Sequence, residues 1–86
     1  MNQKFKNLAT HAVVITTYDA AEAIEKDVTE KWAGAEVFEN PYGGFGTSLL
    51  MYENADCGFE KLCEFVDDVH TRILEWGGSA DKTAIF

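Results

Sequence analysis

Residues 58–78 read GFEKLCEFVDDVHTRILEWGG, and this stretch decides the fold because it sorts its side chains onto two sides of one long helix. At about 100° per residue, the carboxylates fall within a stripe roughly 100° wide and the apolar side chains fall opposite. The carboxylates are Glu60, Glu64, Asp67, Asp68 and Glu75. The apolar residues are Phe59, Leu62, Cys63, Val66, Val69, Ile73 and Leu74. The pattern predicts a helix with one acidic side in solvent and one side on a core.

Residues that favour helix ends flank this stretch. Asn54 or Asp56 is expected to cap the N-terminus, because both side chains can accept a hydrogen bond from a free backbone N–H group. Gly77 and Gly78 follow Trp76 and are expected to end the helix, since glycine readily adopts the left-handed backbone of a helix C-cap.

A second, shorter helix is predicted upstream, over residues 20–33. Its apolar residues recur at i, i+3, i+7 and i+11, which places them on one face. They are Ala21, Ile24, Val28 and Trp32. Asp19 is the expected N-cap, and Gly34 is expected to close the C-terminus.

The remaining segments predict strands. HAVVITTY, residues 11–18, is rich in β-branched residues and is typical of a buried strand. AEVFEN (35–40) and FGTSLLMYE (45–53) predict two strands around a turn that contains Pro41 and three glycines. The tail SADKTAIF (79–86) predicts a short edge strand.

The order strand, helix, strand, strand, helix, short strand predicts an α+β domain of the ferredoxin-like split βαβ class. In that architecture both helices lie on one face of a small antiparallel sheet. The chain has 86 residues, which is the size of one domain. We expect residues 1–10 to form an N-terminal arm or lead-in, and residues 11–86 to form the single α+β domain.

The second face of this sheet is expected to need a cover. The strands at residues 11–18 and 45–53 carry apolar side chains on both sides, whereas an open antiparallel sheet normally alternates apolar and polar residues. A second copy of the chain could cover this face and form a homodimer. Alternatively, the Tyr and Thr side chains tolerate water and the face stays open.

Charge and cysteine content restrict the function and the location. The formal net charge is −8, which repels nucleic acid and anionic membranes and attracts basic proteins. Direct binding of nucleic acid and binding to membranes are therefore not predicted. Cys57 and Cys63 would lie about 120° apart on a helix, too far around it to bridge, so both are expected to be free thiols. Free thiols indicate a reducing compartment, and we expect a cytoplasmic protein.

No catalytic, cofactor-binding or metal-binding residue is predicted. Cys57, Cys63 and His70 have the spacing C-x5-C-x6-H, which is not a common zinc pattern. Asp67 and Asp68 are adjacent on an exposed helix, where carboxylates lack the desolvation that acid–base catalysis needs. The sequence predicts a protein that is not an enzyme.

One short stretch is similar to a nucleic-acid-binding family. GGFGTSLLMY, residues 43–52, resembles the third-strand motif of the RNA-recognition motif through Gly44, Phe45 and Gly46. Thr47, however, occupies the position of an aromatic residue that stacks on a base, and the domain is acidic. No RNA-binding residue is therefore inferred. Tyr42 and Phe45 at the turn remain candidate protein-contact residues, since aromatic side chains are common in binding hot spots.

The carboxylates of both helices are the main functional candidates. The first helix adds Glu22, Glu25 and Glu30 to the stripe described above. Carboxylates one helical turn apart lie about 5–6 Å from one another, which is similar in scale to phosphate spacing along a nucleic-acid strand. We therefore expect a small acidic protein that docks on or inhibits a basic, nucleic-acid-handling protein, by analogy with inhibitors encoded by phages or mobile elements.

Two other interpretations remain open. The carboxylates can simply be the solvated outer face of two helices. In a different class of function, a dimer of ferredoxin-like domains would enclose a small ligand against the apolar sheet face, as a regulatory domain or a cofactor-free enzyme. Tyr18 and Tyr52 would line that pocket.

Overall fold

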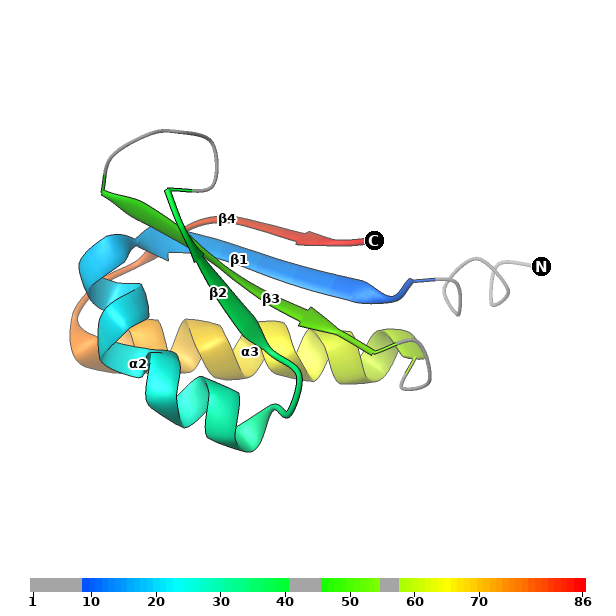
Figure 1. The fold of residues 1–86 in the computed structure, drawn as a ribbon. Helices are drawn as coiled ribbons and strands as arrows, with labels where there is room; N and C mark the ends of the chain where they lie inside the picture. Colours follow the sequence, from blue (N-terminus) through cyan, green and yellow to red (C-terminus); the bar gives the residue numbers. More distant parts are fainter. Residues whose placement is uncertain (1–8, 41–45, 55–57) are drawn as a thin grey trace.

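A computed structural model describes residues 9–40, 46–54 and 58–86 of the chain (Figure 1). These residues form two helices and four strands, which follow one another in the predicted order. The elements are β1 (His11–Thr17), α2 (Tyr18–Lys31), β2 (Glu36–Glu39), β3 (Thr47–Glu53), α3 (Gly58–Trp76) and β4 (Ala80–Ile85). The fold is a small α+β domain, as the sequence predicted.

The four strands form one antiparallel sheet in the order β2-β3-β1-β4. The predicted buried strand β1 lies at the centre, where its full length pairs with β3, from His11 opposite Glu53 to Thr17 opposite Thr47. β4 pairs with β1 alone and is an edge strand, which confirms that prediction. The register between β1 and β4 shifts after Ile15, so one residue of β4 bulges there.

Both helices pack against the same face of this sheet (Figure 1). Alternate residues of the central strands, Ala12 and Val14 in β1 and Leu50 and Tyr52 in β3, point toward them. The helices contribute the remaining core side chains, and these include all four residues of the predicted α2 stripe. Those core residues are Ala20, Ala21, Ile24, Val28, Trp32, Leu62, Phe65, Val66, Val69 and Ile73.

Three aromatic rings form the centre of this core. The Phe65 ring stacks on Tyr52 with ring centroids 5.1 Å apart, and meets Trp32 edge-on at 5.5 Å. Trp32 also meets Tyr52 edge-on at 5.2 Å. The three rings come from the C-terminal end of α2, from α3 and from β3, so they connect the helix layer with the sheet.

The buried side of α3 differs from the predicted one. Leu74 was predicted to pack on the core, but it is 65% exposed, and Phe59 is 37% exposed. Phe65, which the predicted face left out, is fully buried. The buried sector is rotated around the helix axis toward α2, because α3 packs against α2 as well as against the sheet. As a result, Phe65 is buried and Leu74 is exposed.

The N-cap of α2 also differs from the prediction. Asp19 was expected to cap the helix, but α2 begins two residues earlier than predicted, at Tyr18, and the cap is Thr17. The extended backbone of Thr17 lets its hydroxyl accept a hydrogen bond from the Ala20 N–H group at 3.2 Å. Asp19 lies in the first turn instead, where its charge complements the helix dipole.

The predicted C-terminus of α3 is confirmed. Gly77 has a φ of +106°, and its N–H group donates to the Leu74 carbonyl at 3.0 Å. The Gly78 N–H group donates to the Ile73 carbonyl at 3.0 Å. This is the paired hydrogen-bond pattern of a Schellman motif, which reverses the chain into β4.

The sheet face away from the helices is apolar. Val13 and Ile15 of β1 lie on it beside Leu49 and Met51 of β3, in agreement with the alternation of the strands. The prediction that Tyr52 lines this face is wrong, because Tyr52 lies on the same side of β3 as Leu50 and points into the core. Within the described residues, neither helix is long and apolar enough to cross a membrane.

Candidate functional site

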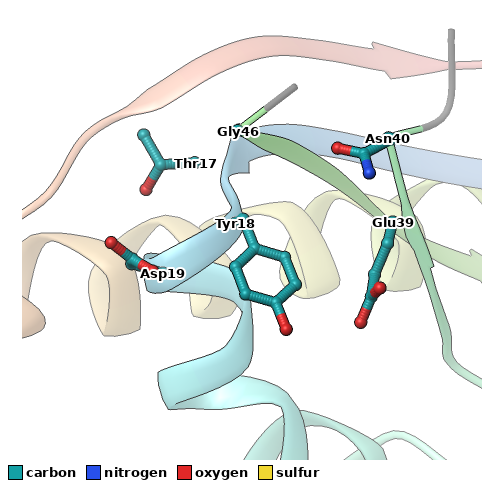
Figure 2. Close-up of a pocket in the computed structure, with 6 residues that line it drawn as sticks. All are labelled: Thr17, Tyr18, Asp19, Glu39, Asn40 and Gly46. Atoms are coloured by element: carbon teal, nitrogen blue, oxygen red, sulfur yellow. The ribbon is translucent and has the colours of Figure 1, made fainter. Parts of the chain in front are cut away.

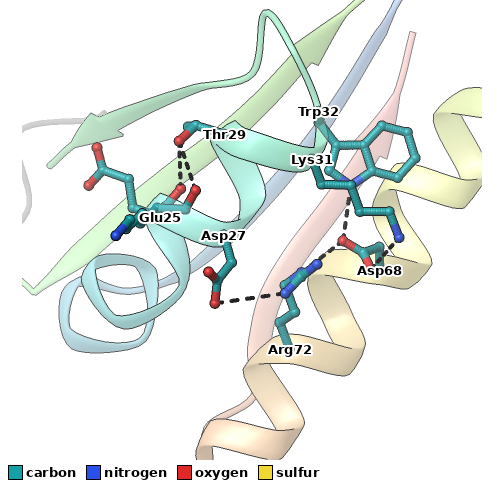
Figure 3. A network of polar contacts seen from close by, with 8 residues as sticks. Glu25, Asp27, Thr29, Lys31, Trp32, Asp68 and Arg72 are labelled. Atoms are coloured by element: carbon teal, nitrogen blue, oxygen red, sulfur yellow. Dashed lines mark hydrogen bonds and ion pairs between the residues drawn. The ribbon is translucent and has the colours of Figure 1, made fainter.

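The space between α2 and α3 is organised around the carboxylate of Asp68 (Figure 3). Its Oδ2 atom accepts hydrogen bonds of 2.9 Å from Trp32 Nε1 and from Arg72 Nε. Its Oδ1 atom lies 3.3 Å from Lys31 Nζ. Arg72 Nη1 also reaches Asp27 of α2, at 3.9 Å from Oδ2. Asp68 therefore contacts three donors, of which Lys31 and Trp32 connect it to the C-terminal end of α2, while Arg72 lies on α3 itself.

The surroundings of Asp68 favour its charged form. Burial alone would raise the pKa of this carboxyl group, because only 18% of the side chain is exposed. Hydrogen bonds from Trp32, Arg72 and Lys31 outweigh burial and hold the pKa below its ordinary value. Asp68 was predicted to contact a partner, but the structure places both of its oxygens in contacts within the domain.

The basic side chains of the helices gather at this same junction. Lys31 and Arg72 pair with Asp68, and Lys61 Nζ lies 5.1 Å from the centre of the Trp32 ring. These are three of the four basic residues of α2 and α3, and the fourth is Lys26. Three of the four basic side chains of the helices therefore lie near the junction of α2 and α3.

The other predicted carboxylates point into solvent. Within the described residues, no ion pair involves any of them. Glu22 accepts a hydrogen bond from the Tyr18 hydroxyl at 2.9 Å, and the rest have exposed side chains. We call this set the acidic helix layer. It consists of Glu22, Glu25, Glu30, Glu60, Glu64, Asp67 and Glu75.

A shallow hollow of about 400 Å³ lies in the seam between the helices. Lys31, Trp32 and Lys61 line one part, and Glu64 and Asp67 of the acidic helix layer line another. The hollow is open and its lining mixes both charges with an indole edge. Such a surface suits a protein side chain better than an enclosed small molecule.

A second hollow of about 530 Å³ lies where β1 leads into α2 (Figure 2). Tyr18, Glu39 and Asn40 line it together with Gly46. The hydrogen bond to Glu22 and the negative charges of Glu22 and Glu39 raise the pKa of Tyr18. The phenol is therefore protonated at neutral pH and is not a ready base. Tyr42 and Phe45, the predicted contact residues of the turn, lie outside the described residues.

His11 has polar partners that the sequence did not reveal. Its Nδ1 atom lies 2.6 Å from Thr10 Oγ1, its Nε2 atom lies 3.5 Å from Glu53 Oε2, and its ring stacks on Phe86. A hydroxyl, imidazole and carboxylate in series is the order used by some hydrolases. Here the carboxylate is 61% exposed and beyond short hydrogen-bond distance, so the series is not preorganised for catalysis.

Residues 9–40, 46–54 and 58–86 contain no group of three or more His, Cys, Asp or Glu side chains positioned to hold a metal ion. Cys63 is a free, partly buried thiol, while Cys57 and the predicted cap Asp56 lie outside the described residues. Comparisons with protein-family models, with curated proteins and with solved structures found no match to this chain.

The Asp68 network gives a test by pH. Because the folded-state pKa of Asp68 is lowered, its charge stabilises the fold above the unfolded value of about 3.9 and loses this effect as the pH falls through the folded-state pKa. Asp68→Asn is expected to cost about 1–3 kcal/mol of unfolding free energy at pH 7, and the cost should shrink below about pH 4. Urea unfolding between pH 2.5 and 7 measures this difference.

The matched control is Asp67→Asn, on the exposed neighbour. This variant should stay within about 0.5 kcal/mol of the natural protein at every pH. If both variants had the same unfolding free energy across the pH range, Asp68 would not be a link between the helices.

Proposed function

We propose that this chain is a non-enzymatic binding protein that docks its acidic helix layer on a basic protein surface of the kind that binds nucleic acid. One observation supports this most strongly. Lys31, Lys61 and Arg72 lie at the junction of the helices, around Asp68 and Trp32, while the remaining carboxylates face solvent. The seven exposed carboxylates of the acidic helix layer therefore outnumber the basic side chains of the two helices.

The charge distribution supports the same proposal. α2 and α3 hold ten of the fifteen acidic residues and four of the seven basic residues, so they carry −6 of the net −8. A surface with one dominant sign steers an oppositely charged partner and raises the rate of association. Glu60 and Glu64 lie one turn apart on α3, which places their Cβ atoms about 5–6 Å apart, a scale similar to that of a row of phosphates.

We also assign the architecture to the ferredoxin-like class. The element order supports this assignment, as does the central position of β1 and β3 between β2 and β4. In this arrangement the helices occupy one face and leave the other free. The assignment bears on the shape of the docking surface and carries no activity with it.

A capture experiment with competition tests the proposed function. The protein is immobilised and exposed to a lysate at about 100 mM salt, and the retained proteins are challenged with a 20-base-pair DNA duplex or with about 500 mM salt. We expect a basic protein that both treatments release, because the duplex and the acidic helix layer would compete for one site. A retained protein that resists both treatments would contradict the proposal.

A second candidate function uses the opposite side of the molecule. An apolar groove of about 310 Å³ runs over the open sheet face, lined mainly by Val13, Ile15, Leu49, Met51 and Phe86. This volume is at the lower limit of small-ligand pockets. Tyr18 and Tyr52 were expected to line it and do not. Native mass spectrometry of the purified protein separates the candidates, since a retained small molecule would favour this one.

A further inference from the structure

The open sheet face has an ordered pattern of side chains that follows from the strand register. Across the sheet from β2 to β4, one row reads Phe38, Leu49, Ile15 and Lys82. The next row reads Glu36, Met51, Val13 and Ala84. The two central strands thus carry four apolar side chains on this face. Glu36 lies at the β2 edge of the face and Lys82 lies at the β4 edge.

We infer that this face is the interface of a symmetric homodimer in which Lys82 of each protomer pairs with Glu36 of the other. A twofold axis that lies in the interface, parallel to the strands and midway between β1 and β3, would bring β4 of one protomer over β2 of the other. Lys82 of one protomer would then lie over Phe38 of the other, and Phe38 is two residues along β2 from Glu36. The contact would occur twice, because a twofold interface is self-complementary.

Charge complementarity selects this axis over the perpendicular one. A twofold axis running across the strands would bring β2 over β2 and β4 over β4, and it would place Lys82 over Ala84. Lys82 and Glu36 would then be separated by the width of the sheet, about 14 Å at 4.8 Å per strand. The axis parallel to the strands covers the apolar centre and also satisfies both edge charges.

Apolar exposure at the edges of this face supports a contact between proteins, while Val13 and Ile15 at its centre are each 8% exposed. Phe38 is 41% exposed at the β2 edge, and Phe86 is 60% exposed beyond the end of β4. Aromatic side chains in such positions are typical of interface anchors. The aliphatic part of Lys82 can cover the Phe38 ring while its ammonium group reaches the carboxylate, as lysine commonly does at apolar surfaces.

The size of the face predicts a weak dimer. Four strands about 4.8 Å apart and about six residues long give a face of roughly 400 Å² per protomer, about half that of a standard stable interface. We therefore expect a dissociation constant on the order of 10 µM. This interface lies opposite α2 and α3, so it leaves the acidic helix layer free and does not depend on the proposed function (Figure 1).

A charge swap tests the pairing. Sedimentation velocity from about 5 to 500 µM should show a concentration-dependent dimer. K82E and E36K, made separately, should each weaken dimerisation at least about tenfold, because each places like charges together twice. The double variant, K82E with E36K, should return the dissociation constant to within about threefold of the natural value. K26E, a matched change on the exposed side of α2, should leave it unchanged.

Other outcomes would overturn the inference. A protein that stays monomeric at 500 µM would mean that the face stays open to water or takes a different occupant, and the inference would fail. A dimer that both single variants leave intact, or that the double variant does not restore, would place the interface elsewhere. Thermal unfolding of each variant by circular dichroism verifies that a loss of dimer is not a loss of fold.

Discussion

Phe65→Ala is expected to destabilise the domain by about 3–5 kcal/mol, which is most of the stability of a small domain. The Phe65 ring is fully buried and contacts both Tyr52 and Trp32, so its removal leaves a cavity where α2, α3 and the sheet meet. Urea unfolding followed by circular dichroism measures the change. We expect the variant to be substantially unfolded at 37 °C.

Phe59→Ala is the matched control, because it removes the same side chain from the same helix. Phe59 is partly exposed near the start of α3, so its loss should cost at most about 1 kcal/mol. Equal destabilisation by the two variants would mean that the aromatic trio is not the centre of the core. The comparison holds helix propensity constant and varies burial alone.

Neutralising three carboxylates of the acidic helix layer should weaken partner binding by about 10–100-fold. The helix variant combines E60Q, E64Q and D67N, and it changes the net charge from −8 to −5 by removing three negative charges. Each lost charge at an exposed interface is expected to cost about 0.5–1 kcal/mol. Titration of each variant against the protein captured in the competition experiment measures the effect.

A strand variant with the same net charge is the control for this comparison. It combines E39Q, E53Q and D81N, at exposed positions on three different strands. It should bind within about threefold of the natural protein if position on the helices matters. Equal weakening by the two variants would mean that net charge alone governs binding, and the helices would lose their special role.

Short-range patterns were enough to predict most of the fold. The 3.6-residue period of α3, the β-branched run of β1 and the glycines after Trp76 each specify local structure through neighbours in sequence. The α2 cap was missed because Thr17 and Asp19 are both good caps, and the backbone angle of Thr17 selects between them. The buried sector of α3 was misplaced because it depends on contact with α2, which helix periodicity does not encode.

The candidate site was predictable only in part, for a related reason. Helical spacing identified the carboxylates of the acidic helix layer without any tertiary information. It could not distinguish Asp68 from them, because the Trp32 indole that holds Asp68 is 36 positions away in sequence. The position of Asp68 at the margin of the stripe, beside Arg72, was the available signal. The strand pattern also did not determine which face meets the helices, since both faces of β1 and β3 are apolar, and Tyr52 was assigned to the wrong face.

Carboxylate footprinting of the complex tests the docking surface most directly. Carbodiimide-mediated labelling followed by mass spectrometry reports the accessibility of each acidic side chain in the free and bound protein. The account predicts that binding protects Glu60, Glu64 and Asp67 on α3, together with the α2 members of the acidic helix layer, while Glu53 and Asp81 stay labelled. Protection of Glu53 and Asp81 with continued labelling of the acidic helix layer would contradict it.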